Sequence, residues 1–86
     1  KELDIVAEHQ GELIVVEVRT RRNQIYGTPE ESISEAKIRR IVSSADAYVR
    51  KFRIDLPVRF DIISLTGVQP PLEIEHIVNA FYPPIW

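Results

Sequence analysis

The 86-residue sequence contains no cysteine and no apolar run that approaches the ~18–20 residues of a membrane-spanning helix. The absence of cysteine excludes a disulfide framework and a thiolate metal site, and it favours a reducing, cytoplasmic setting. The opening residues do not have the pattern of a secretory signal peptide. Because the chain has no initiator methionine and Lys1 leads directly into a strand-like run, we expect the natural protein to begin earlier, with an N-terminal element that this chain lacks.

The length and the remaining composition are those of one globular domain, so we expect residues 1–86 to form a single domain. The net charge of −2 conceals an uneven distribution along the chain. Residues 1–18 carry one Lys against five acids (−4), residues 19–53 nine Lys and Arg against four acids (+5), and residues 54–86 one Arg against four acids (−3). Such asymmetry can hold a polyanion beside a cation site, although a run of charge is more often a solvated face.

Hydrophobic patterning predicts four strands and one long helix. The strands are predicted at residues 2–9, 12–20, 56–67 and, more weakly, 72–78. A helix is predicted from about Ser34 to Phe52, with an apolar stripe formed by Ile38, Ile41, Val42, Ala45, Tyr48, Val49 and Phe52. Ser32 and Glu35 fit a capping box, and Ser34 is the competing N-cap. Residues 20–33 are predicted to be a loop and 79–86 an irregular cap, so the order indicates an α/β fold with one sheet and a helix on its face.

Gln10 and Gly11 predict a tight hairpin turn between the first two strands. A two- or four-residue loop pairs residues whose numbers sum to 21, which sets Asp4 opposite Glu17 and Glu2 opposite Arg19. A three-residue loop would shift the register by one residue and separate the two acids. Alternation then divides the hairpin into two faces. Glu2, Asp4, Glu17 and Arg19 share one face, and the other is apolar, formed by Leu3, Ile5, Ala7, Ile14, Val16 and Val18.

Two opposed carboxylates destabilise a sheet unless something neutralises them. The neutralising partner is a shared proton, a neighbouring basic side chain or a divalent cation. Mg²⁺ accepts one or two protein carboxylates and keeps its other positions for water and phosphate oxygens. The simpler alternative is that Arg19 bridges the two acids as a structural ion pair.

These residues resemble a known pattern. Asp4, a twelve-residue gap and then Glu17-Val18-Arg19 are similar to the motif of the PD-(D/E)xK nucleases, which have the restriction-endonuclease-like fold. Almost the whole chain resembles the YraN family of uncharacterised endonuclease-like proteins. The segments that carry this likeness, in order, are "ELDIVA", "GELIVVEVRTR", "YGTPEESISEAKIRRI", "SADAYV", "VRFDIISL" and "IEHIVNAFYP". The resemblance implies a mixed four-stranded sheet, an N-terminal hairpin plus two later strands, with the long helix packed on it.

The resemblance also implies roles for individual residues. Asp4 and Glu17 would bind Mg²⁺ or Mn²⁺, with the carbonyl of Val18 as a third ligand. Arg19 stands where the superfamily usually has lysine; it stays protonated, so it would stabilise charge on a phosphate or hold a water but could not act as a general base. Lys37 would reach toward the scissile phosphate, with a solvated residue as the alternative.

Four arginines are candidates for phosphate contacts that position a nucleic acid without reading its sequence: Arg21, Arg22, Arg39 and Arg40. Family members carry a helix before the first strand that can contribute a further acidic residue. That helix is not in this sequence, and Glu2 is the local substitute.

Other residues fit a site less well. His9 and His76 have no nearby cysteine or second histidine and do not predict a zinc site. Asp61 is better explained as an ion pair with an arginine than as a catalytic acid. Ser43 and Ser44 lack a His–Asp partner pattern, so nucleophilic catalysis is unsupported.

The leading hypothesis is a metal-dependent nuclease-type domain acting on DNA or a branched nucleic acid, with loop 20–33 flanking the bound strand. The alternatives are a non-catalytic nucleic-acid-binding or assembly module and a purely structural protein. No membrane contact is expected. The aromatic tail could join two copies into a homodimer, a question that the sequence leaves open.

Overall fold

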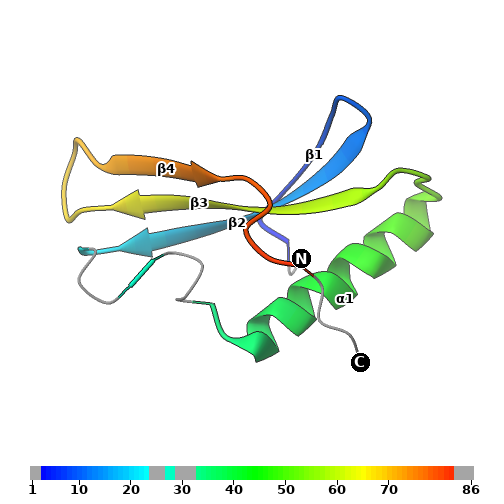
Figure 1. Ribbon diagram of the computed structural model, residues 1–86, viewed down its shortest axis with the longest axis horizontal. Coiled ribbons are helices and arrows are strands. Elements are labelled where there is room, and N and C mark those ends of the chain that lie inside the picture. Colours follow the sequence, from blue (N-terminus) through cyan, green and yellow to red (C-terminus); the bar gives the residue numbers. More distant parts are fainter. Residues whose placement is uncertain (1–2, 24–26, 29–32, 83–86) are drawn as a thin grey trace.

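The computed structural model describes residues 3–23, 27–28 and 33–82 (Figure 1). In chain order the elements are β1 (Ile5–His9), β2 (Glu12–Arg21), α1 (Glu35–Phe52), β3 (Val58–Thr66) and β4 (Glu73–Ile77). The four strands form one sheet in the order β1-β2-β3-β4. The outer pairs β1–β2 and β3–β4 are antiparallel and the central pair β2–β3 is parallel. This confirms the predicted α/β fold with a mixed four-stranded sheet and one long helix.

The first hairpin has the predicted two-residue turn. Gln10 and Gly11 both have positive φ angles, 51° and 81°, as a turn that matches the right-handed twist of the strands requires. The register pairs His9 with Glu12 and Val6 with Val15, so paired numbers sum to 21 as predicted.

The prediction for the first residues of this hairpin was wrong in part. β1 begins at Ile5 rather than at residue 2, so Asp4 precedes the first residue paired with β2. Leu3, expected on the face opposite the acids, packs instead against the core cluster that contains Val15. The chain bends at Asp4, which lets the Leu3 side chain bury part of its apolar surface against the core instead of extending the ladder. Glu2 lies outside the described residues, so the expected pairing with Arg19 is not described.

Helix α1 begins and ends close to the predicted residues. Ser34 is the N-cap, and its side chain accepts a hydrogen bond from the backbone N–H of Lys37 at 3.1 Å. Ser32, the other candidate cap, lies outside the described residues. The helix ends at Arg53, whose left-handed conformation turns its N–H back onto carbonyls of the last turn. In the part of the chain that the structure describes, no helix has the length and apolar character to cross a membrane.

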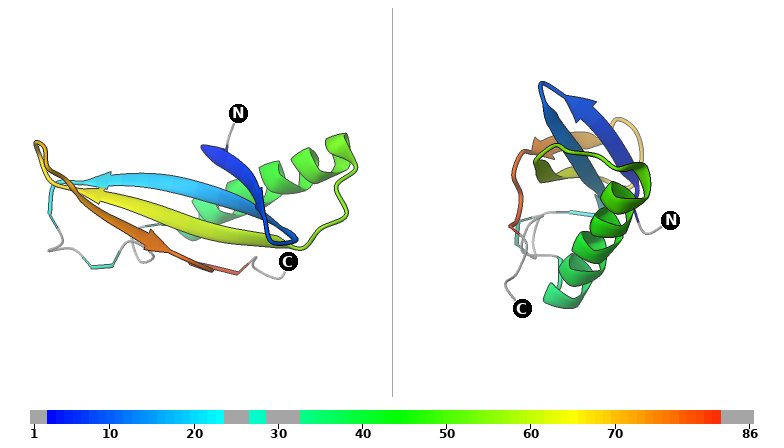
Figure 2. Two further views of the ribbon diagram at one scale, coloured as in Figure 1. Left: turned by 90° about the horizontal axis from the view of Figure 1, so that it is seen from above. Right: turned by 90° about the vertical axis from the view of Figure 1, so that its right-hand side faces the viewer.

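The core lies between α1 and one face of the sheet (Figure 2). Its centre consists of Val15, Ile41, Ala45 and Phe60. Phe52, which the spacing placed in the apolar stripe, is 56% exposed and packs on Tyr48 at the end of the helix. After β4 the chain stays beside β3, where Ala80 donates a hydrogen bond to the carbonyl of Phe60 at 2.7 Å, and the Phe81 ring stacks on Phe60. The tail thus caps the core without forming a helix or strand through residue 82, as predicted.

Candidate metal and phosphate site

The carboxylate of Glu17 lies between β2 and the first turn of α1. Alternation along β2 sends its side chain to the same face as Val15, the face that α1 covers. Lys37 lies one helical turn before the buried Ile41, so its side chain also points toward the sheet. The Oε2 atom of Glu17 is 3.6 Å from Nζ of Lys37 and 3.6 Å from Nη1 of Arg19. Strand and helix therefore bring together three of the predicted site residues.

The negative charge of Glu17 is neutralised by nearby cations, but its carboxylate oxygens are not fully hydrogen-bonded. Glu17 is only 5% exposed, so its charge needs compensation inside the fold. Both cations provide it, but a separation of 3.6 Å is longer than a hydrogen bond. A buried carboxylate is stabilised fully only when its remaining lone pairs are also satisfied. The oxygens of Glu17 can therefore accept a further hydrogen-bond donor or a cation.

Asp4 precedes β1 and lies beside β2, against the residue that follows Glu17. Its Oδ2 atom accepts a hydrogen bond from the backbone N–H of Val18 at 2.9 Å. The N–H and C=O of one residue in an extended strand point to the same side, so the Val18 carbonyl also faces Asp4. The predicted face-to-face ladder pair of Asp4 with Glu17 is replaced by this contact to the backbone, because β1 begins at Ile5, one residue after Asp4.

The donor set suits a hard cation with few protein ligands. Glu17, Asp4 and the Val18 carbonyl offer oxygen only, which is what Mg²⁺ and Mn²⁺ prefer. The described residues contain no group of three or more His, Cys, Asp or Glu side chains arranged for a metal. Mg²⁺ is commonly held by one or two carboxylates with water completing its shell, so these residues fit that ion and do not fit zinc.

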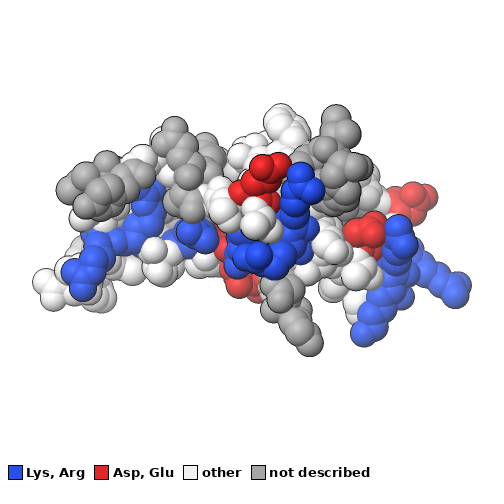
Figure 3. All heavy atoms as spheres, turned by 90° about the horizontal axis from the view of Figure 1, so that it is seen from below, with Lys and Arg blue, Asp and Glu red and all other residues white. Residues whose placement is uncertain are grey.

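The four arginines predicted to contact phosphate differ in their surroundings. Arg21 is half-buried on the same face as Glu17 and Arg19. Its Nη2 atom donates to the carbonyl of Gly27, and its Nη1 atom is buried with no acceptor among the residues that the structure describes. Arg22 and Arg40 are exposed. Arg39 is held in a helical ion pair with Glu35 at 3.2 Å. Figure 3 shows basic side chains gathered on the helix side of the molecule, with acidic side chains among them.

Ser64 is a residue of this region that sequence reasoning missed. In the part of the chain that the structure describes, only two buried polar side-chain atoms have no hydrogen-bond partner, Arg21 Nη1 and Ser64 Oγ. Ser64 pairs with Arg19 in the β2–β3 register, so its side chain lies on the face of Glu17. A serine within the apolar run of β3 was the signal in the sequence that could have identified it.

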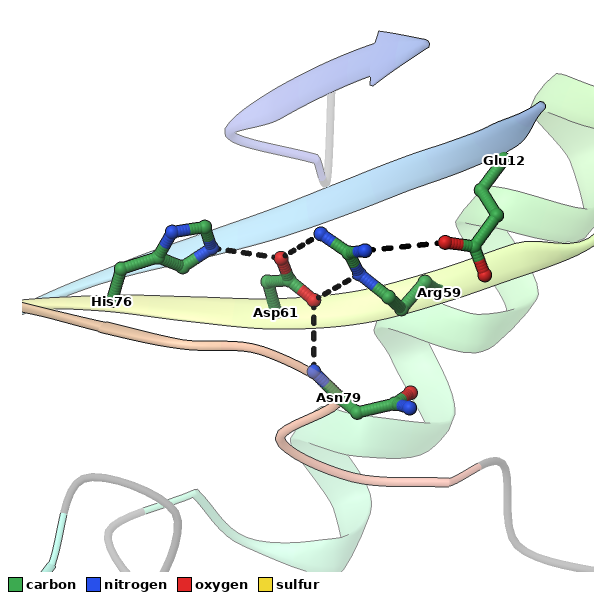
Figure 4. A network of polar contacts seen from close by, with 5 residues as sticks. All are labelled: Glu12, Arg59, Asp61, His76 and Asn79. Atoms are coloured by element: carbon green, nitrogen blue, oxygen red, sulfur yellow. Dashed lines mark hydrogen bonds and ion pairs between the residues drawn. The ribbon is translucent and has the colours of Figure 1, made fainter. Parts of the chain in front are cut away.

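A second polar network lies on the sheet face opposite α1 (Figure 4). Asp61 is 0% exposed and accepts two hydrogen bonds from Arg59, at 2.9 and 2.8 Å, and one from the backbone N–H of Asn79 at 3.0 Å. Nε2 of His76 lies 2.8 Å from the same carboxylate, and Arg59 also bonds to Glu12. The prediction that Asp61 forms an ion pair with an arginine is confirmed; the contact with His76 was not foreseen.

Charge and burial act in opposite directions on this carboxylate. Burial alone would raise the pKa of Asp61, but hydrogen bonds from Arg59, the Asn79 backbone and His76 outweigh burial and leave the pKa below its ordinary value. The hydrogen bond to Asp61 raises the pKa of Arg59 in return. The network ties β2, β3, β4 and the turn after β4 together, and it takes no part in the site around Glu17.

Fold and site together define a small α/β domain with a carboxylate and basic side chains gathered between a parallel strand pair and its crossover helix. The chain belongs to the uncharacterised protein family UPF0102, which it matches over residues 1–65, and this confirms the resemblance to the YraN family. It is 64% identical to a UPF0102 protein of Phocaeicola vulgatus over all of this chain and 71% of that protein. It is 52% identical to one of Bacteroides thetaiotaomicron, over 99% of this chain and 70% of the relative. A Flavobacterium psychrophilum protein of this family is 38% identical over 94% of this chain and 68% of its own length.

Proposed function

We propose that this chain is a metal-dependent nuclease-type domain with a restriction-endonuclease-like fold, which binds DNA or a branched nucleic acid and hydrolyses its phosphodiester bonds. Glu17 and Asp4, with the Val18 carbonyl, hold Mg²⁺ or Mn²⁺. The observation that carries the proposal is a buried glutamate on an apolar strand with two cations 3.6 Å away, beside a second carboxylate anchored to the next residue.

The basic side chains of the chain have two roles, charge stabilisation and positioning of the nucleic acid. Arg19 and Lys37 are about one third exposed, so they can turn from Glu17 toward an incoming phosphate and balance the negative charge that develops on it. Arg21, Arg22 and Arg40 position the backbone of the nucleic acid. A bound divalent cation would polarise a phosphoryl oxygen and make an attacking water more acidic.

The experiment measures Mn²⁺ binding and DNA cleavage with matched variants. Isothermal titration of Mn²⁺ into the full chain should give one site that weakens at least tenfold in Asp4→Ala and Glu17→Gln. Asp55→Asn, which removes an exposed acid outside the cluster, should bind as the parent chain does. Equal Mn²⁺ affinity in the parent, Asp4→Ala and Glu17→Gln would refute the metal site.

A second candidate is a non-catalytic nucleic-acid-binding module that retains the nuclease fold. It is favoured by Arg19, which cannot act as a base, and by the neutralisation of Glu17 by two side chains of the chain itself. Plasmid and branched DNA incubated with Mg²⁺ or Mn²⁺ separate the two functions. Cleavage that disappears in Glu17→Gln supports the nuclease, whereas DNA retention that persists in EDTA without any cleavage supports the binding module.

A further inference from the structure

Ser64 and Arg21 each bury a polar atom that finds no partner within the described residues. Ser64 is 1% exposed, so water does not replace the missing partner of its hydroxyl. Folded proteins seldom leave buried donors and acceptors unpaired, because an unmade hydrogen bond inside the fold costs free energy. Two such atoms in adjacent residue pairs of one sheet face indicate that this face binds a polar ligand.

The register fixes where these atoms lie relative to Glu17. In the parallel pair β2–β3, Glu17 is paired with Ile62, Arg19 with Ser64 and Arg21 with Thr66. Because side chains two residues apart share a face, Ser64 lies beside Arg19 and one row from Glu17, and Arg21 lies in the row after it. The two unpartnered atoms therefore adjoin the cluster of Glu17, Arg19 and Lys37.

The chemistry of the missing partner follows from the groups around it. Nη1 of Arg21 can only donate a hydrogen bond, and a serine hydroxyl can donate as well as accept. Arg19 and Lys37 add positive charge on the β2 side. On the other side β4 pairs Glu75 with Ser64, and a cavity of about 260 Å³ is lined by Thr66, Ile74 and two glutamates. An anionic oxygen is thus attracted to the β2 side of Ser64 and repelled from the β4 side.

We infer that Ser64 is a phosphate-binding residue whose hydroxyl donates a hydrogen bond to a non-bridging oxygen of a phosphodiester held by Arg19, Arg21 and Lys37. This inference rests on the proposed function and adds a residue to its site. Arg19 is the register neighbour of Ser64 and is one third exposed, so its side chain can turn toward a phosphate that approaches the hydroxyl. The hydroxyl binds and does not attack, because no described side chain accepts its proton, and His76 is bonded to Asp61 on the other face of the sheet.

Ser64→Ala separates a binding role from a structural one, since the two roles predict opposite results. The variant is measured by urea denaturation and by anisotropy of a fluorescein-labelled oligonucleotide at low salt in EDTA. We expect unchanged or higher stability, because no hydrogen bond within the fold is lost, and an affinity lower by about threefold to tenfold. Ser64→Cys replaces the hydroxyl with a somewhat larger group that is only a weak donor, and it should weaken binding similarly. The exposed helix residue Ser43, changed to Ala, is the matched control; it should leave the affinity unchanged and the stability at or slightly above that of the parent chain, because alanine favours the helix.

The outcomes that overturn the inference are distinct from failure of the proposed function. Parent-like affinity in Ser64→Ala, with a loss of stability, would mean that the hydroxyl has a structural acceptor. An affinity loss seen only with Mn²⁺ and not in EDTA would assign the hydroxyl to the metal's water rather than to phosphate. If the parent chain itself binds neither the oligonucleotide nor Mn²⁺, the proposed function fails and this inference falls with it.

Discussion

Changing Asp61 to Asn should destabilise the fold more than any other single loss of charge. The carboxylate is 0% exposed and receives four hydrogen bonds, from Arg59, His76 and the Asn79 backbone. Breaking one partner out of a buried ion pair typically costs about 3–5 kcal/mol. Arg59 keeps its contact with Glu12, so the loss for Asp61→Asn should lie toward the lower end of that range. That is a large share of the ~5–15 kcal/mol by which a domain is stable.

Urea denaturation followed by far-UV circular dichroism measures this loss. With an m value of about 1–1.5 kcal/mol/M for a chain of this size, the midpoint for Asp61→Asn should fall by about 2 M or more. His76→Ala removes only the hydrogen bond from a half-exposed side chain and should lower the free energy of unfolding by about 1 kcal/mol. This variant still tests the network if Asp61→Asn does not fold.

The loss should also depend on pH. The pKa of folded Asp61 lies below the pKa of ~3.9 that an unfolded aspartate has, so the carboxylate contributes fully above that value. The contribution disappears as the pH falls through the lower, folded pKa. The difference in stability between the parent chain and Asp61→Asn should therefore be present at neutral pH and shrink below about pH 4.

Asp46→Asn is the control for the charge change itself. Asp46 forms an exposed helical ion pair with Arg50, 3.1 Å apart, and its loss should cost less than about 0.5 kcal/mol. If Asp61→Asn is as stable as Asp46→Asn, the network of Figure 4 contributes no net stability and the reasoning is refuted.

Three further predictions concern the helix start, the hairpin and the nucleic-acid contacts. Ser34→Ala should lower stability by about 1 kcal/mol in urea denaturation, since it removes the N-cap; an unchanged midpoint would show that the cap is dispensable. Gly11→Ala should cost about 1–2 kcal/mol although open space surrounds the added methyl group, because φ is +81°, and a thermal midpoint equal to that of the parent chain would contradict this. Arg40→Ala should reduce the slope of log affinity for DNA against log salt by about 1. Arg39→Ala should change this slope less, because Arg39 already forms an ion pair with Glu35. A slope for Arg40→Ala equal to that of the parent chain would show that Arg40 does not contact the DNA.

Most of the fold followed from local pattern. Gln10-Gly11 between two Val- and Ile-rich runs sufficed to predict the hairpin turn and its register, because a two-residue turn pairs the residues on either side of it, His9 and Glu12, and so fixes every later pair. Periodicity predicted the helix, whose first turn then carried Lys37 toward the sheet. The start of β1 was missed, since the burial of Leu3 depends on Ile41 and Phe60, which are distant in the sequence.

The site was predicted less completely than the fold. Glu17, Arg19 and Lys37 could be named because a charged residue in an apolar strand is conspicuous and because the family resemblance pointed to the helix lysine. Ser64 was visible only as a serine within an apolar run. Its place beside Arg19 was not, since the parallel pairing of β2 with β3 is a contact across the α1 crossover that no local pattern specifies. The same holds for His76, which reaches Asp61 only once β4 folds back on β3.

The most direct test of the metal site is anomalous X-ray scattering from a crystal of the full chain soaked in Mn²⁺. We expect one peak at the edge of β2, within coordination distance, about 2.1 Å, of a carboxylate oxygen of Glu17, with Asp4 as its neighbour and Lys37 turned away. A crystal that shows no such peak at millimolar Mn²⁺, with Lys37 still 3.6 Å from Glu17, would contradict it.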